Sequence, residues 1–159
     1  MNTVKAPSVA ERLIQLGLQL PAAPRPAGRY QPWVIANGLL FISGQIPLID
    51  GALTLRGRVG AELSEDQGRE ATRIAALNVL AQIDAALGGF DRLITLARVE
   101  GTVSSAPGWY QQPRVLDAAS ELFYETLGRR GDHARAAFGT ASLPLDAPVE
   151  LVVTAAVRP

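Results

Sequence analysis

The feature that most constrains the fold is the stretch of residues 133–153, where two apolar runs flank a short connection containing Pro144 and Pro148. Both runs favour β-structure, and each carries one charge, Arg135 in the first and Glu150 in the second. A charge inside a strand with a core-like composition is costly unless it is paired or used. The stretch therefore predicts two strands and marks Arg135 and Glu150 as candidate site residues.

The chain before this stretch predicts further strands and two long helices. Asn37-Gly38 between two β-rich runs is a strong hairpin signal, and apolar residues at helical spacing indicate the helices. The expected strands are residues 31–36, 39–43, 52–55 and 93–103. The expected helices follow the capping box that opens at Ser64 and the Gln112-Pro113 pair, and they stop near Leu87 and Gly128.

The N-terminal part predicts an appendage to the main fold. Ser8 and Glu11 form a second capping box in front of a short apolar face, so a helix of two to three turns is expected. Residues 21–28 form a Pro-rich connector without helix or central-strand potential. At 159 residues the chain is expected to be one domain, 1–159, in which residues 1–28 are the helix and its connector.

The predicted order of elements indicates the fold class α+β, with a mixed sheet and two long helices on one face. The second face of such a sheet also needs a cover. The remaining chain offers only the N-terminal helix for this purpose, so burial between subunits is the natural solution.

The composition excludes several kinds of function. Lys+Arg and Asp+Glu both number 15, so no basic excess indicates a nucleic-acid partner. The absence of cysteine and the single histidine exclude a thiolate or histidine metal cluster and a cysteine nucleophile. No apolar run approaches a membrane span, and no Walker or dinucleotide motif indicates a cofactor. A soluble cytoplasmic protein without metal or cofactor is expected.

The two charged residues each allow two interpretations. Arg135 should share its strand face with Ala137, Gly139 and Ala141, a shallow floor beside which a guanidinium could bind a planar carboxylate. Spacing alone favours a salt bridge instead, for which Glu150 is a candidate partner. Glu150 could orient a water molecule or serve as an ion-pair partner.

Other residues carry weaker local signals. Ser43 and Gly44 end a strand, and Gly44 permits close approach to the backbone, where free amides could bind an anion, although a simple turn is the more economical interpretation. His133 is expected to be an exposed loop residue. The aromatic residues are expected to pack in the core or at an interface.

Several motifs in the same order resemble the YjgF/RidA family, formerly called endoribonuclease L-PSP. They are Ser43-Gly44-Gln45-Ile46-Pro47, Asn78, Arg135, Leu143-Pro144 and Val149-Glu150. The resemblance covers roughly residues 30–157. The N-terminal helix, residues 57–60 and the His-Ala-Arg sequence are similar to a longer-chain branch of poorly defined function.

The resemblance implies a chorismate-mutase-like fold and a homotrimer with ligand clefts between subunits. Well-known members hydrolyse 2-imino acids to 2-keto acids and ammonia. In that scheme Arg135 holds the substrate carboxylate, Glu150 handles the water, the Gly44 backbone borders the ligand next to Ser43, and Tyr30 is the cleft tyrosine. Asp117 and Ala137 correspond to further cleft positions.

Three features depart from the family pattern. The cysteine usually found two residues after the motif arginine is Ala137 here, and a helix position often occupied by asparagine is Asp117. The segment of residues 104–112 is longer than usual and carries Trp109 and Tyr110. These changes leave the expected fold intact and concern the shape of the cleft and the substrate that it accepts.

The sequence therefore supports three functional hypotheses. The first is an imine/enamine deaminase acting on a small carboxylate-bearing substrate. The second is a non-catalytic trimer that binds small carboxylate metabolites. The third, RNA cleavage, has weak chemical support because the chain has no net charge and one histidine.

Overall fold

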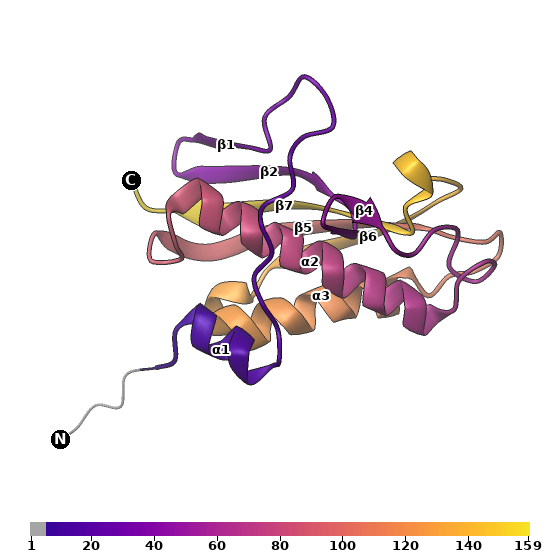
Figure 1. Ribbon diagram of the computed structural model, residues 1–159, viewed down its shortest axis with the longest axis horizontal. Helices are drawn as coiled ribbons and strands as arrows, with labels where there is room; N and C mark the ends of the chain where they lie inside the picture. Colours follow the sequence, from indigo (N-terminus) through magenta and orange to yellow (C-terminus); the bar gives the residue numbers. More distant parts are fainter. Residues whose placement is uncertain (1–5) are drawn as a thin grey trace.

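The computed structural model describes residues 6–159, which form a sheet with helices on one side (Figure 1). The sheet has the strand order β1-β2-β7-β5-β6, in which only β5 and β6 are parallel. Its strands are β1 (Trp33–Ala36), β2 (Leu39–Gln45), β5 (Leu93–Ser104), β6 (Ala134–Thr140) and β7 (Val149–Val157). The helices are α1 (Val9–Gln15), α2 (Glu65–Leu87) and α3 (Gln112–Leu127), and the 3-10 turns are η1 (Gly128–Gly131) and η2 (Pro144–Asp146).

Local sequence signals account for most element boundaries. Asn37 and Gly38 both have positive φ, 50° and 74°, as the tight β1–β2 hairpin requires. The capping boxes at Ser8 and Ser64 are both formed, and α2 ends at Gly88 in the left-handed conformation. The predicted hairpin and both helix starts are thus confirmed.

One predicted strand takes a different place. Residues 52–55 were expected as a strand, but β4 (Ala52–Leu53) is shorter and pairs only with β3 (Leu48–Ile49) in a separate two-stranded ribbon. The turn at Asp50 and Gly51, with φ of 49° and 80°, folds the chain back on itself immediately. Both strands are therefore too short to extend the main sheet.

The hydrophobic core lies between one face of the sheet and the pair α2 and α3. Strand β7 contributes every second residue to it, and the alanines of α2 allow close packing. Fully buried side chains include Val79, Leu80, Ile83, Leu122, Phe123, Leu151 and Ala155. The fold class α+β with two long helices on one face is confirmed.

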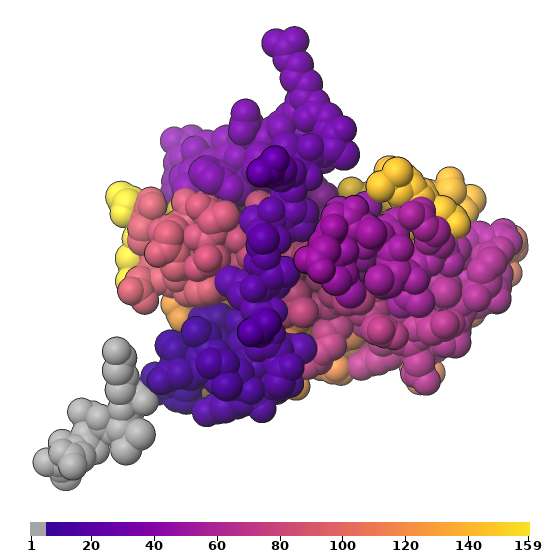
Figure 2. All heavy atoms as spheres, in the orientation of Figure 1, coloured from indigo at the N-terminus to yellow at the C-terminus, as the bar shows by residue number. Residues whose placement is uncertain are grey.

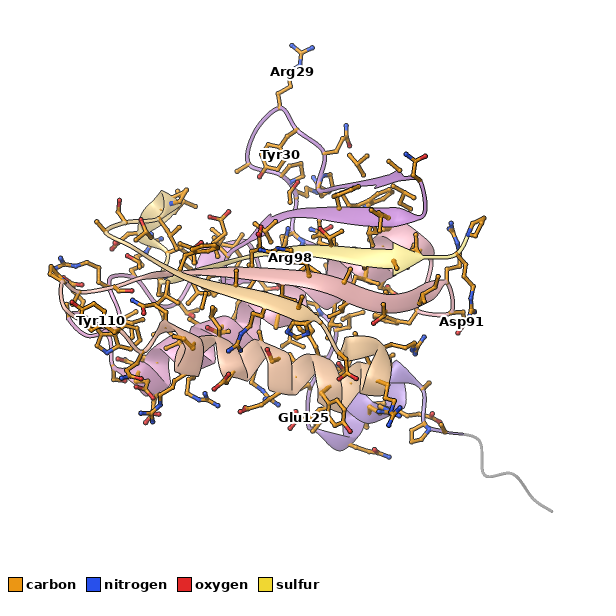
Figure 3. All side chains as sticks on the ribbon, turned by 180° about the vertical axis from the view of Figure 1, so that it is seen from behind. Arg29, Tyr30, Asp91, Arg98, Tyr110 and Glu125 are labelled. Atoms are coloured by element: carbon orange, nitrogen blue, oxygen red, sulfur yellow. The ribbon has the colours of Figure 1, made fainter. Side chains whose placement is uncertain are left out.

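The opposite face of the sheet is uncovered in the single chain (Figure 3). Apolar side chains on it remain open to solvent, with exposed fractions of 51% for Phe138, 44% for Phe41 and 40% for Val152. Helix α1 contacts α3 and so does not cover this face. Burial of the face between subunits remains a prediction. No helix of residues 6–159 is long and apolar enough to cross a membrane.

Candidate functional site

Arg135 and Glu150 lie on opposite faces of the sheet. Arg135 is in register with Val99, which is in turn in register with the buried Val153, so Arg135 is on the helix-covered side. Glu150 is in register with Thr102 and hence with the exposed Phe138, so it is on the open side. Within one chain, Arg135 and Glu150 therefore cannot form the salt bridge for which Glu150 was a candidate partner.

The partner of Arg135 is Asp117 on α3. Nη1 of Arg135 donates to Oδ1 of Asp117 over 2.9 Å and to Oγ of Ser120 over 3.1 Å, while Nη2 is 3.4 Å from the carbonyl oxygen of Pro113. The side chains of Arg135 and Asp117 are 24% and 47% exposed. A carboxylate within the chain thus already engages one end of the guanidinium.

His133 continues this network, although the sequence suggested an exposed loop residue. Its Nδ1 is 2.6 Å from the carbonyl oxygen of Gly131, which can only accept, so Nδ1 carries the proton. In the neutral ring Nε2 then accepts from the Ser120 hydroxyl over 3.0 Å. Ser120 was not singled out from the sequence, but its position three residues after Asp117 puts both on one helix face and could have indicated it.

Glu150 lies in a different environment, in a cavity of about 260 Å³. Its carboxyl group is half-buried, and burial raises its pKa above the ordinary value. Among residues 6–159 the carboxylate has neither a hydrogen-bond nor an ion-pair partner. The cavity is also lined by Arg25, Tyr30, Gly44, Gln45, Pro144 and Leu145.

Gly44 permits this position of Glu150. A bulge in β2 sets two residues, Ser43 and Gly44, opposite Val152 alone. A Cβ on Gly44 would overlap Oε1 of Glu150, so only glycine leaves room for the carboxylate. Ser43 donates to the carbonyl oxygen of Gln31 over 2.7 Å, which fixes the start of the bulge.

The Pro-rich connector forms one wall of this cavity and is more than a linker. Nε2 of Gln82 on α2 donates to the carbonyl oxygen of Pro24 over 2.8 Å. Asn78 on the same helix holds the segment after β2 by donating to the carbonyl oxygens of Ile46 and Leu48, both over 3.0 Å. Figure 2 shows the connector in indigo, crossing the surface from α1 to the loop before β1.

The predicted site residues thus form two groups within one chain. Tyr30, Ser43, Gly44 and Glu150 lie around the cavity, which we call the Glu150 pocket. Asp117 and Arg135, which together with Ser120 we call the Arg135 group, lie where α3 packs on the outer strand β6, and Ala137 on that strand packs against the core. Among residues 6–159 no group of three His, Cys, Asp or Glu residues could hold a metal ion.

The segment of residues 104–112 lies apart from both groups. Trp109 packs against Gly60, and Tyr110 is 79% exposed. Together with Gly139 and Thr140, the segment lines a separate hollow of about 310 Å³.

Comparisons with known proteins assign the fold to a family. The family described as "YjgF/chorismate_mutase-like, putative endoribonuclease" matches residues 10–156. Protein TCP17 of Trypanosoma cruzi is 39% identical over 152 residues, covering 95% of each chain.

Solved structures agree with this match. A protein of unknown function from Agrobacterium tumefaciens is 36% identical with a TM-score of 0.89, over 94% of this chain and 92% of that one. A protein from Shewanella oneidensis described as a "putative endoribonuclease" is 32% identical with a TM-score of 0.91, over 95% of this chain and 100% of that one. The chain belongs to the YjgF/chorismate-mutase-like family, as the motifs around Gly44, Arg135 and Glu150 predicted.

Proposed function

We propose that this chain is a hydrolase of the imine/enamine deaminase type, which converts 2-imino acids to 2-keto acids and ammonia. The observation that carries the proposal is Glu150, a partly desolvated carboxyl group that has no partner among residues 6–159 and lies next to a glycine that leaves it room. A carboxyl group whose pKa is raised toward neutrality is suited to general acid–base catalysis.

The site is completed, in this proposal, between the subunits of a homotrimer. Glu150 and Arg135 lie on opposite faces of one sheet, so a single chain cannot present both to one substrate. The exposed apolar side chains beside Glu150 on the open face favour contact with a second copy. The Arg135 group of one subunit would then border the Glu150 pocket of another.

Glu150 performs the proton transfers in this reaction. The substrate reacts as its iminium form, and the Glu150 carboxylate takes a proton from the water whose oxygen attacks C2, which gives a neutral carbinolamine. Glu150 returns this proton to the nitrogen, the C–N bond breaks with its electron pair on nitrogen, and ammonia leaves. The hydroxyl proton on C2 passes to Glu150 and from there to the ammonia, so that C2 becomes a carbonyl and the products are the 2-keto acid and ammonium. Water is consumed, and no oxidant or cofactor is needed.

Arg135 positions the substrate carboxylate in this scheme. Its Nη1 is engaged by Asp117 and Ser120, whereas Nε has no partner among residues 6–159. A carboxylate can therefore approach the edge formed by Nε and Nη2, the side-on geometry that arginine offers. Asp117 and Ser120 keep the guanidinium in place.

The test uses 2-iminobutanoate, generated in the assay by an amino-acid oxidase. The wild-type protein is expected to accelerate loss of the imine, and Glu150→Gln to lower kcat by about 10²- to 10⁴-fold. The control is Glu100→Gln, on the same face but ion-paired with Arg98 over 2.8 Å. Absence of acceleration by the wild-type protein would refute the activity, and a monomer in sedimentation would refute the shared cleft.

A non-catalytic binder of small carboxylate metabolites is the second candidate. The observation in its favour is that Asp117 neutralises Arg135. A tight network of this kind can be maintained without any catalytic turnover. Calorimetric binding of 2-oxobutanoate in the absence of imine hydrolysis would favour this function over the first.

A further inference from the structure

We propose that Arg25 makes the Glu150 pocket selective for imino acids that carry a second acidic group, such as 2-iminoglutarate. This inference rests on the proposed function. It begins with an arginine from the connector, a part of the chain that the sequence did not place in the site. Arg25 lines the same cavity as Glu150 and also a neighbouring hollow of about 410 Å³.

Arg25 differs from most other arginines of the protein because its guanidinium has no partner among residues 6–159. Six arginines form ion pairs with carboxylates: Arg58, Arg69, Arg73, Arg98, Arg114 and Arg135. Within residues 6–159 the side chain of Arg25 has neither an ion pair nor a hydrogen bond, and the same holds for Arg29 and Arg129. Of these three, only Arg25 lines the Glu150 pocket.

The backbone of Arg25 is held in place. Pro24 and Pro26 flank it, and a residue before proline is restricted to extended conformations. The carbonyl oxygen of Pro24 accepts the hydrogen bond from Gln82 on α2, which ties this point of the connector to the body of the protein. The side chain of Arg25 therefore starts from a fixed attachment in the wall of the pocket, and its engagement of a ligand costs little backbone entropy.

The arrangement of charges indicates where a second acidic group would bind. Glu150 repels an anion from its own side, and Arg135 is already neutralised by Asp117. Among the described residues that line the pocket, Arg25 is the only one with a positive charge. A substrate with its imine at Glu150 and its first carboxylate at Arg135 could place a second carboxylate against Arg25, and a charge-assisted pair there would favour binding.

The experiment compares two substrates, 2-iminoglutarate and 2-iminobutanoate, generated by oxidases acting on the corresponding amino acids. The measured quantity is the ratio of kcat/KM for the diacid to that for the monoacid. Arg25→Gln is expected to lower this ratio about tenfold or more, mainly through KM for the diacid. Arg25→Lys, which keeps the charge, is expected to retain part of the preference.

The matched control is Arg29→Gln, which removes the same charge four residues away. Arg29 points away from the protein at the tip of its loop (Figure 3), so its loss is expected to leave the ratio unchanged. An equal ratio in wild type and Arg25→Gln, or an equal drop in Arg29→Gln, would overturn the role of Arg25.

Failure of the proposed function can be distinguished from failure of this inference. If the wild-type protein hydrolyses neither imine, the deaminase activity is refuted. Calorimetry with 2-oxoglutarate and 2-oxobutanoate then tests Arg25 as a binding residue. Preferential binding of the diacid that is lost in Arg25→Gln supports its role, and equal binding of both acids refutes it.

Discussion

The Arg135 group and the Glu150 pocket are both centred on one charge in a strand, yet they differ in how that charge is compensated. Arg135 has Asp117, Ser120 and the carbonyl oxygen of Pro113 as partners, and the network continues to His133. Glu150 has a glycine beneath it, a cavity beside it and no partner among the described residues.

This difference indicates which group is poised for chemistry. A satisfied polar network is already stabilising and can be retained for structural reasons. A carboxyl group that is partly desolvated and unpaired costs stability, and such a cost is typical of functional sites. The proton transfers are therefore expected at Glu150, with Arg135 as a holder of substrate.

The largest effect that would test this comparison is expected from Gly44→Ala. The new Cβ would overlap Oε1 of Glu150 and displace the carboxylate. Because a misplacement of about 1 Å at a catalytic group can cost about 10²-fold, kcat is expected to fall by that order. The measurement is the rate of imine hydrolysis, with urea unfolding to show that the fold is kept.

The matched variant on the other strand is Gly139→Ala in β6. Its Cβ would also meet the end of a side chain, Nε2 of Gln112, at 2.7 Å. Gln112 is not in the Glu150 pocket, so a much smaller loss of rate is expected. Similar losses in both variants would show that any added methyl group disturbs the activity, and the specific role of Gly44 beside Glu150 would be refuted.

The sequence predicted the elements well because their signals are local. The capping boxes at Ser8 and Ser64, the Asn37-Gly38 hairpin and the alternation along β7 each depend on residues close in the chain. The motifs also singled out Gly44 and Glu150, which the structure brings together. These two positions interact directly across neighbouring strands.

The remaining features depend on contacts between distant segments, which local patterns do not encode. Asp117 was suspected as a departure from the family pattern, but its pairing with Arg135 depends on how α3 lies over β6. The place of Arg25 depends on a hydrogen bond between Gln82 and Pro24, 58 residues apart. Neither contact has a periodic signature, so the structure was needed to find them.

A smaller effect is expected from Asp117→Asn, which tests the Arg135 group. The amide oxygen can still accept from Nη1 of Arg135, but the negative charge is removed. Net positive charge beside the substrate is expected to lower KM for 2-iminobutanoate several-fold, with the effect in KM rather than in kcat. The free energy of unfolding should change by less than about 1 kcal/mol, since Asp117 is 47% exposed and its ion pair is screened.

The steady-state kinetics of Asp117→Asn and of Asp117→Ala separate charge from position. Both variants remove the charge, but only asparagine keeps the hydrogen bond to Arg135. If asparagine lowers KM and alanine raises it, Asp117 both neutralises and positions the guanidinium. An unchanged KM in both variants would mean that Arg135 does not contact the substrate carboxylate.

The smallest effect is expected in the pH dependence of stability, where Glu150 should behave oppositely to an ordinary ion-paired carboxylate. Burial raises its pKa, so the native state binds its proton more tightly than the unfolded state does. The wild-type protein should therefore lose stability relative to Glu150→Gln as pH rises from the ordinary pKa of glutamate to the raised native value, and the difference should be constant above it.

Glu62 supplies the control of opposite sign. The Arg58 guanidinium lowers the pKa of Glu62 to about 2, so its contribution is present above the ordinary pKa and is lost as pH falls toward about 2. Relative to Glu62→Gln, the wild-type protein should thus gain stability as pH rises through that window. Urea unfolding of the three proteins between about pH 3 and pH 7 measures both slopes. Slopes of the same sign would mean that Glu150 is charge-stabilised in the folded protein, and its assignment as the unpaired acid of the pocket would be wrong.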